Sequence, residues 1–309
     1  MFRVKSARRN IGFVALAIAF IFLFSTALQI VISALVVLAG GAKLFESIVF
    51  SWTVGSLPMY FVAMPLSILF FRQCDQVIEP IPQKLTPWRF ISVLSVCLVG
   101  SYAFSILGNI VNRIFSAMLG REAVNEIEEL AVSAPIWANI LFLVILAPIF
   151  EEIFFRKLVI DRLLPYGELP AVVLSGVAFG LIHGNFNQFF YAVAIGMIFG
   201  LVYLRTGNIL YSIGMHMILN LIGGVYASEV LKLLDAGSSV GVLLNAIYFV
   251  LLGAALVVAL INARKPFLRH VCHFTPAEPR ATAREWMSVL ARNPSVWVFL
   301  AVAALMFVL

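Results

Sequence analysis

The chain is a succession of long apolar runs separated by short polar segments. Nine runs can be distinguished, at about residues 11–40, 49–71, 90–112, 136–164, 169–186, 188–204, 208–227, 239–263 and 295–309. They lack the alternation of apolar and polar residues that is typical of β-strands, so each predicts a helix. All but the last have at least the roughly 17 residues that a helix needs to cross a bilayer. The last run has only about 15 residues, and a re-entrant or incompletely spanning end is the alternative there.

Composition agrees with a membrane protein. Of the 309 residues, 62% are hydrophobic and 12% are charged, whereas about a quarter of the residues in a soluble domain are charged. So few polar residues cannot cover a surface that faces water. In lipid every backbone N–H and C=O must be paired internally, which continuous apolar runs achieve as helices. We therefore expect an all-α, polytopic transmembrane bundle of about eight to nine spans, with no soluble domain.

The chain divides at about residue 264. Residues 1–263 form the predicted eight-span bundle, and residues 264–309 hold a polar loop and the ninth run. Within the loop, Thr282 followed three residues later by Glu285 predicts a capping box that starts a short helix. Three apolar residues would share one face of this helix, namely Trp286, Val289 and Leu290. We expect the helix to lie in the membrane interface, with binding of a partner as the alternative.

Lysine and arginine are concentrated in alternate loops. One predicted side holds most of the 21, namely Arg3, Lys5, Arg8, Arg9, Arg72, Lys84, Arg89, Arg156, Lys157, Arg162, Arg205, Arg264, Lys265, Arg269, Arg280, Arg284 and Arg292. The other side holds Lys43, Arg113, Arg121 and Lys232, with the acidic residues Glu122, Glu126, Glu128 and Glu129. Because cytoplasmic loops carry the positive charge, we expect a cytoplasmic N-terminus and a cytoplasmic loop at 264–294. The net charge of +6 then follows from topology, and no nucleic-acid partner is expected.

Ionisable residues within the apolar runs are the candidates for chemistry, because a charge in lipid is costly. The fourth run contains Pro148, Glu151, Glu152 and Arg156. Glu152 and Arg156 are four residues apart, so they share a helix face and can form an ion pair that locks helices together. Glu151 points about 100° away, and we assign it to chemistry. Pro148 lacks an N–H, which predicts a kink or access of water one turn earlier.

Two of the four histidines lie in later runs. The fifth run holds Phe179 and His183, and the seventh holds His216 and Asn220. A single histidine in a span serves as readily in hydrogen bonding between helices as in a reaction. His216 and Asn220, however, are one turn apart and share a helix face. Measured from the predicted cytoplasmic helix ends, His183, His216 and Asn220 lie at roughly 12–21 Å along ideal helices. Glu151 falls in the same band, so all four can converge in one water-filled cavity.

Three short motifs occur in order on separate runs: Glu-Glu-x-x-x-Arg at 151–156, Phe-x-x-x-His at 179–183 and His-x-x-x-Asn at 216–220. Together they resemble the CPBP family of intramembrane proteases, which includes the type II CAAX prenyl endopeptidases and the bacteriocin-processing and immunity proteins. The resemblance covers about residues 135–227. The first three runs and the tail after residue 264 add nothing specific to it.

The resemblance implies a role for each motif position. Glu151 is expected to be the general base that activates water, and His183 to help hold that water. His216 and Asn220 are expected to stabilise the oxyanion of the tetrahedral intermediate. The remaining motif residues, expected to support these four, are Glu152, Arg156 and Phe179.

The residues leave two mechanisms open. Glu151, His183 and His216 could hold a divalent metal such as zinc in an open catalytic site. The base would then have to be a different group, such as Glu152. A metal-free, glutamate-type mechanism is the interpretation that we favour, because no further carboxylate or cysteine is dedicated to supporting a metal.

The predicted function is an intramembrane endopeptidase that acts on a peptide or protein substrate at the lipid bilayer. Two alternatives remain: a non-catalytic immunity or partner protein of the same fold, and a proton-coupled transporter, since buried Glu and His also form proton paths. The presence of all four candidate residues argues against the first. The clustering of carboxylates on one helix, without an inverted repeat, argues against the second. A multi-pass protein of the plasma membrane is favoured over one of the endoplasmic reticulum.

Overall fold

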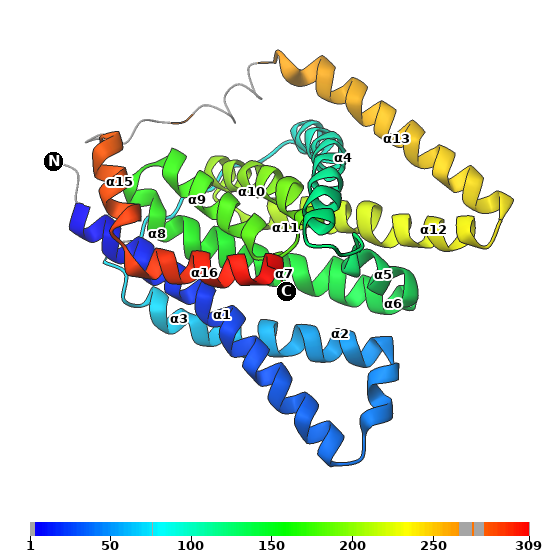
Figure 1. The fold of residues 1–309 in the computed structure, drawn as a ribbon. Helices are drawn as coiled ribbons and strands as arrows, with labels where there is room; N and C mark the ends of the chain where they lie inside the picture. The colour runs from blue at the N-terminus through cyan, green and yellow to red at the C-terminus, as the bar shows by residue number, and fades with distance from the viewer. Residues whose placement is uncertain (1–3, 76, 266–273, 275–280, 309) are drawn as a thin grey trace.

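The computed structural model describes residues 4–75, 77–265, 274 and 281–308. Within these residues every regular element is a helix and no strand is present, which confirms the all-α prediction. The α-helices, shown in Figure 1, are α1 (Val4–Leu38), α2 (Ile48–Leu57), α3 (Met64–Phe71), α4 (Pro87–Met118), α5 (Glu126–Ser133), α6 (Ile136–Asn139), α7 (Ala147–Glu152), α8 (Asp161–Leu163), α9 (Glu168–Leu181), α10 (Phe186–Thr206), α11 (Ile209–Asn220), α12 (Ala227–Asp235), α13 (Ser239–Ala263), α15 (Ala283–Ala291) and α16 (Pro294–Val308).

Several α-helices continue into π-helical stretches, in which the backbone hydrogen bonds reach back five residues rather than four. These stretches are η2 (Pro58–Ala63), η3 (Ile140–Leu146), η4 (Ile153–Ile160) and η6 (Leu221–Tyr226). Two short 3₁₀ turns, η1 (Ala42–Glu46) and η5 (Leu164–Tyr166), complete the regular structure of the described residues.

In the described part of the chain, seven continuous helices are long and apolar enough to cross a membrane. They are Val4–Leu38, Ile48–Phe71, Pro87–Met118, Ile136–Tyr166, Phe186–Thr206, Ile209–Asp235 and Ser239–Ala263. The protein is therefore an integral, multi-pass membrane protein, as predicted. The bent pair of α15 and α16 raises the number to eight if it counts as one span. A count of nine full spans is too high, because the fifth and ninth runs form shorter helices.

The fifth predicted span, at 169–186, is not a full span. Its helix α9 has 14 residues, or about 21 Å, whereas the hydrocarbon core of a bilayer is roughly 30 Å thick. The chain turns at Gly184, whose φ of 65° is open to glycine and strained for other residues. Asn185 then caps α10, because its Oδ1 accepts a 2.9 Å hydrogen bond from the N–H of Gln188. His183 consequently lies in the turn after α9, and not inside a helix as predicted.

α9 and α10 form an antiparallel hairpin with glycines at the contact. A Cβ on Gly196 of α10 would lie 3.1 Å from the Cα of Gly176 on α9, and one on Gly200 would lie 3.1 Å from Ile160. Only small residues allow two helices to approach this closely. The same Cβ on Gly196 would lie 3.0 Å from the ring of Phe179. The close contact at Gly196 thus fixes the position of the Phe179 ring.

The predicted helix after residue 282 is present as α15. Oγ1 of Thr282 accepts from the N–H of Glu285 at 3.2 Å, and Oε2 of Glu285 accepts from the N–H of Thr282 at 2.7 Å, which is the predicted capping box. Val289 is fully buried, and Trp286 and Leu290 pack on the same core. The shared apolar face is therefore confirmed, whereas its position in a membrane interface stays a prediction.

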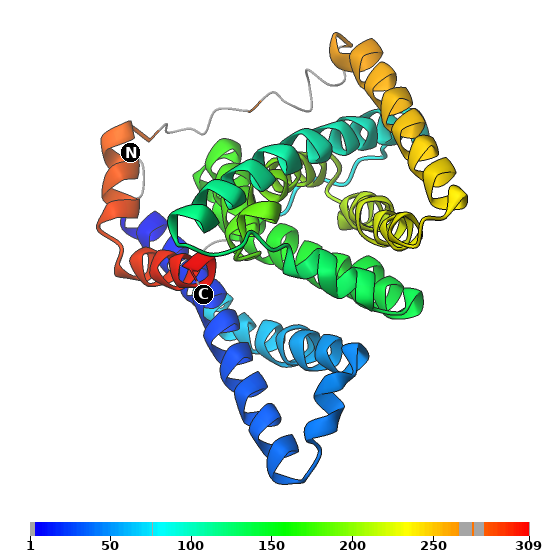
Figure 2. The ribbon, with the colours of Figure 1, turned by 45° about the vertical axis from the view of Figure 1, so that its right-hand side comes forward.

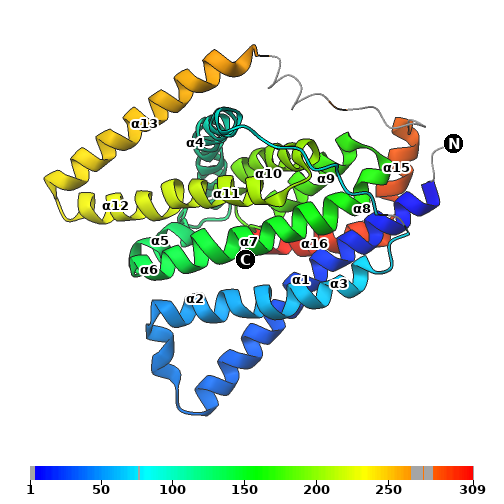
Figure 3. The same ribbon diagram turned by 180° about the vertical axis from the view of Figure 1, so that it is seen from behind.

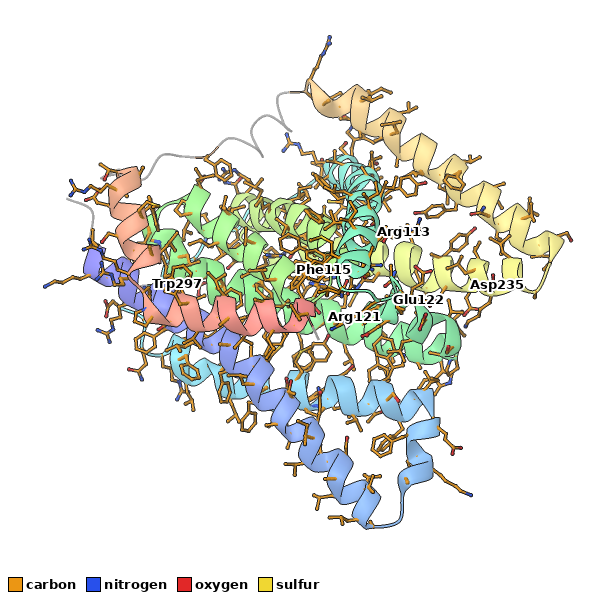
Figure 4. The ribbon with its side chains drawn as sticks, viewed as in Figure 1. Arg113, Phe115, Arg121, Glu122, Asp235 and Trp297 are labelled. Atoms are coloured by element: carbon orange, nitrogen blue, oxygen red, sulfur yellow. The ribbon has the colours of Figure 1, made fainter. Side chains whose placement is uncertain are left out.

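The ninth predicted run is α16, which has 15 residues and is bent by 68° from α15. At its start the indole N–H of Trp297 donates to the carbonyl of Ala291 at 2.8 Å. At its far end Nη1 of Arg121 donates to the carbonyl of Val308 at 2.8 Å. Figure 4 shows Trp297 and Arg121 near the two ends of α16. This short helix is held at both ends.

The segments predicted to share the cytoplasmic side do lie together, at an end of the bundle that we call the basic end. It is formed by residues 4–10, 72–75, 77–86, 157–168 and 205–207. Oδ1 of Asn10 accepts from the N–H of Asp75 at 3.0 Å, and the N–H of Gln83 donates to the carbonyl of Thr206 at 2.6 Å. Figure 3 shows residues 77–86 crossing these helix ends on the way to α4. Its orientation toward the cytoplasm stays a prediction, and Arg3, Arg269 and Arg280 lie outside the described residues.

The first three helices pack against the part of the bundle that carries the predicted site. Figure 2 shows α1 and the α2–α3 run as a hairpin that meets the other helices near the N-terminus and diverges from them toward its tip. Buried residues of this hairpin and of the site region form one apolar cluster, among them Ile18, Ile21, Tyr60, Ala63, Phe154, Phe155 and Phe179. The N-terminal spans, to which the sequence motifs gave no role, therefore contact the fourth spanning helix, Ile136–Tyr166. This helix carries Glu151 and Glu152 and is called the site helix below.

Candidate active site

The fourth spanning helix carries both glutamates, and its backbone hydrogen bonds change between π-helical and α-helical register along its length. In η3 the hydrogen bonds reach back five residues, so the N–H of Ala147 donates to the carbonyl of Phe142. The next donor in this register would reach the carbonyl of Leu143, but the next residue is Pro148, which has no N–H. Asn220 of α11 supplies the missing donor, since its Nδ2 lies 2.8 Å from the Leu143 carbonyl oxygen. The helix therefore continues past the proline without a break.

Glu152 and Arg156 form the ion pair that their spacing predicts. Nε and Nη2 of Arg156 donate to Oε2 and Oε1 of Glu152 at 2.8 and 3.2 Å, and both side chains are fully buried. Arg156 also donates to Oγ of Ser175 on α9 at 3.2 Å. Its guanidinium carbon lies 5.3 Å from the ring centroid of Phe179. Glu152 compensates the buried charge of Arg156, which would be very costly without a partner. The contacts of Arg156 with Ser175 and Phe179 join the site helix to α9.

Glu151 points away from this pair and meets other partners. The hydroxyl of Tyr60, in η2, donates to its Oε1 at 3.3 Å. Its Oε2 lies 3.8 Å from Nε2 of His216, which is longer than a hydrogen bond. The side chain is nevertheless buried, with 7% of the residue's surface exposed. The two oxygens of this carboxylate therefore have different surroundings.

His216 lies between the two carboxylates. Its Nδ1 is 3.2 Å from Oε1 of Glu152, while Nε2 faces Glu151. A carboxylate only accepts hydrogen bonds, so Nδ1 donates to Glu152, whereas Nε2 lies beyond hydrogen-bond distance of Glu151. The rings of Phe179 and Phe199 lie 5.8 and 5.6 Å from the imidazole and pack against it. The orientation of this histidine is therefore fixed by Glu152 and two aromatic rings.

His183 is half-buried and belongs to the turn between α9 and α10. Its Nδ1 lies 2.7 Å from the carbonyl oxygen of Phe179. A carbonyl accepts, so Nδ1 donates and Nε2 is left to bind a ligand. The ring of Phe179 contacts that of His183 at 5.1 Å as well as that of His216. One aromatic side chain thus orients both imidazoles.

A zinc site of the kind considered above does not fit these residues. Among the residues that the structure describes, no three His, Cys, Asp or Glu side chains are grouped so that they could hold a metal ion. Glu151, His183 and His216 are thus not arranged as a ligand set. Glu152, one possible base for the metal alternative, has both oxygens engaged by Arg156 and Nδ1 of His216.

Sequence reasoning missed the contribution of Tyr60 to the site. It lies in the second span, outside the three motifs, and its contact with Glu151 joins residues 91 positions apart. The available signal was a tyrosine inside an apolar run, since a buried hydroxyl needs a hydrogen-bond partner. That signal does not name the partner, so the contact could be found only in the folded chain.

The comparison with protein families agrees with this site. Residues 133–222 match the family model of Rce1-like type II CAAX prenyl endopeptidases, and this segment holds all three motifs. The predicted family resemblance is therefore confirmed over these residues. The matched segment covers less than a third of the chain and lies within a multi-pass helical membrane protein. No curated protein and no solved structure matches the chain.

Proposed function

We propose that this chain is an intramembrane endopeptidase of the glutamate type, which hydrolyses peptide bonds of membrane-associated or peptide substrates. The observation that carries the proposal is the buried carboxylate of Glu151, whose Oε2 faces Nε2 of His216 at 3.8 Å within the family-matched segment. A carboxylate in a membrane span is costly, and such residues generally serve a function. Glu152 is neutralised by Arg156, which leaves Glu151 as the carboxylate for chemistry.

In the proposed reaction Glu151 acts as the general base. A water molecule held by its Oε2 and by the imidazole of His183 attacks the peptide carbonyl carbon, and the water proton passes to Glu151. The carbonyl oxygen becomes an oxyanion, which His216 and Asn220 stabilise through N–H groups. The C–N bond then breaks, and Glu151 gives the proton to the leaving amine. The products are a carboxylic acid and an amine, and the carboxylate is restored.

Asn220 has two amide hydrogens and thus two tasks in this proposal. One hydrogen is engaged by the Leu143 carbonyl at 2.8 Å. The second is left for the oxyanion. His216 lies one turn earlier on the same face of α11, so both donors come from one rigid helix.

The supporting residues hold this arrangement in place. Glu152 fixes Nδ1 of His216, Arg156 fixes Glu152, and Phe179 packs against both imidazoles. Because Glu152 is engaged on both oxygens, it is a poor candidate for the base that a metal mechanism would require. This supports the glutamate type over the metal type. We further propose the plasma membrane as the location.

A cleavage assay on the purified protein in detergent tests the proposal. With a quenched peptide library, the wild type should cleave, and Glu151→Gln should lose roughly 10²–10⁴-fold in rate. Glu126→Gln, which alters an exposed carboxylate of α5, is the matched control and should cleave normally. A strong chelator should leave the wild-type rate unchanged.

Two outcomes would contradict the proposal. If the wild type cleaves no peptide, or if Glu151→Gln cleaves as fast as the wild type, the assignment of an endopeptidase with this base is wrong. If the chelator abolishes cleavage and zinc restores it, the glutamate-type mechanism is wrong.

A further inference from the structure

Tyr60 contacts the proposed catalytic carboxylate from outside the matched segment. It belongs to the second span and is 5% exposed, and its hydroxyl lies 3.3 Å from Oε1 of Glu151. An ionised carboxylate only accepts hydrogen bonds, so the phenol is the donor. The bond occupies Oε1 and leaves Oε2, the oxygen that faces His216 at 3.8 Å. The phenol therefore distinguishes the two oxygens of the proposed base.

Aromatic packing fixes the position of this phenol. The ring of Tyr60 stacks on Phe150, the residue before Glu151, with centroids 5.2 Å apart and planes at 20°. The next residue, Phe61, meets the same ring edge-on at 4.9 Å. Two consecutive side chains of the second span thus hold one ring of the site helix. This packing places the Tyr60 hydroxyl beside Glu151, the residue that follows Phe150.

The local backbone explains how two consecutive residues reach the same ring. Tyr60 and Phe61 lie in η2, where the N–H of Met64 donates to the carbonyl of Met59, five residues back. A π-helical turn holds more residues than an α-helical turn and changes which side chains share a face. Such stretches are frequent at functional sites, and here the stretch lies against the site helix.

We infer that Tyr60 is a positioning residue of this active site, which holds Oε1 of Glu151 so that Oε2 takes the proton of the attacking water. The inference rests on the proposed function. A base whose orientation is fixed before substrate binds needs no reorganisation during the reaction. The N-terminal spans are therefore part of the catalytic structure and not only a membrane anchor.

Removal of the single hydroxyl tests this role. Tyr60→Phe keeps the ring and its stacking on Phe150, so the fold should be retained. Loss of a hydrogen bond to a charged group should lower kcat roughly 10- to 100-fold, with KM within about twofold of the wild type. The matched control is Tyr226→Phe, because the Tyr226 hydroxyl donates to the Leu244 carbonyl at 2.6 Å. This control should leave kcat unchanged.

A second measurement does not depend on activity. Thermal unfolding of the wild type, Tyr60→Phe, Glu151→Leu and the double variant in detergent forms a double-mutant cycle. If the two side chains bind each other, the double variant should unfold at a higher temperature than the sum of the single effects gives. Additive effects would overturn the inference.

The outcomes separate this inference from the proposed function. An active wild type with an unchanged kcat in Tyr60→Phe, or with only a raised KM, would overturn the role of Tyr60 and leave the endopeptidase proposal standing. A wild type that cleaves no peptide would overturn the endopeptidase proposal and the catalytic role of Tyr60 together. The unfolding cycle would then still decide whether Tyr60 holds Glu151.

Discussion

Glu151 and Glu152 are neighbours with the same side chain, and their surroundings give them different tasks. Successive residues of a helix point about 100° apart. Glu152 therefore faces Arg156 and Nδ1 of His216, while Glu151 faces the hydroxyl of Tyr60 and Nε2 of His216. The first carboxylate organises the site, and the second is left to react. Neutralising each one should have a different consequence.

Glu152→Gln should destabilise the fold. It removes the charge that compensates Arg156, which is fully buried, and leaving a buried charge without its partner costs about 3–5 kcal/mol. Glu151→Gln keeps the shape and the acceptor for Tyr60, so it should unfold at nearly the wild-type temperature. The measurement is thermal unfolding of both variants in the same detergent. Equal destabilisation of the two would show that the division of tasks is wrong.

At the residue scale, the sequence could predict contacts between residues a few positions apart on one helix, but not contacts between distant spans. The Glu152–Arg156 pair follows from a separation of four residues on one helix and is present. The contact between Tyr60 and Glu151 depends on how two distant spans pack, so no spacing could predict it. The contact between Asn220 and the Leu143 carbonyl could not be predicted either. It depends on the π-helical hydrogen-bond register of η3, which no residue spacing indicates.

At the scale of elements, apolar run length predicted the helices, and glycine and proline modified them. The run at 169–186 is interrupted by Gly184, which starts a turn with a positive φ and shortens α9 to 14 residues. Pro148 was expected to kink its helix or admit water. In the structure the helix continues through Pro148, because η3 shifts the hydrogen-bond register and Asn220 donates to the carbonyl that the proline leaves free. The donor for the free carbonyl in η3 comes from another helix, so the hydropathy pattern of the fourth run could not predict this register.

The two tasks of Asn220 can be separated with Pro148. Asn220→Ala should lower kcat about 10²–10³-fold through loss of an oxyanion donor, and it should also lower stability because it leaves the Leu143 carbonyl unpaired. Pro148→Ala restores a backbone N–H at the position that reaches this carbonyl. The double variant should therefore regain the unfolding temperature while kcat stays low.

The measurement is kcat and thermal unfolding for the two single variants and the double variant. Recovery of both quantities in the double variant would mean that Asn220 acts only on the helix backbone. A normal kcat with a raised KM in Asn220→Ala would make it a residue that positions substrate.

At the scale of the whole molecule, charge distribution predicted which segments lie together. Three segments share the basic end: residues near the N-terminus, residues 72–75 and 77–86, and the loop after α10. Contacts of Asn10 with Asp75 and of Gln83 with Thr206 show this. The motifs assigned no role in the site to the N-terminal spans, yet the second span contacts Glu151 through Tyr60. Long-range packing of this kind leaves no signal in hydropathy, because lipid-facing and buried surfaces of a span are equally apolar.

Labelling of single cysteines tests the orientation of the basic end. In intact cells an impermeant maleimide should miss Lys84→Cys, an exposed position before α4, and reach Glu126→Cys, an exposed position on the side predicted to lie opposite. The background should replace Cys272 by serine. Native Cys74 should react slowly, because burial raises the pKa of its thiol to about 11. Labelling at position 84 and none at position 126 would reverse the proposed topology.

Glu151 lies on α7 and His183 in the turn after α9, and the proposed mechanism has both side chains act on one water molecule. The most direct test is kcat/KM for the wild type, Glu151→Gln, His183→Ala and the double variant, with the same peptide. Residues that act as a unit have strongly non-additive effects. Each single variant should therefore lose roughly 10²-fold or more, and the double variant should be no slower than Glu151→Gln. A double variant whose loss equals the product of the two single losses would contradict the shared water.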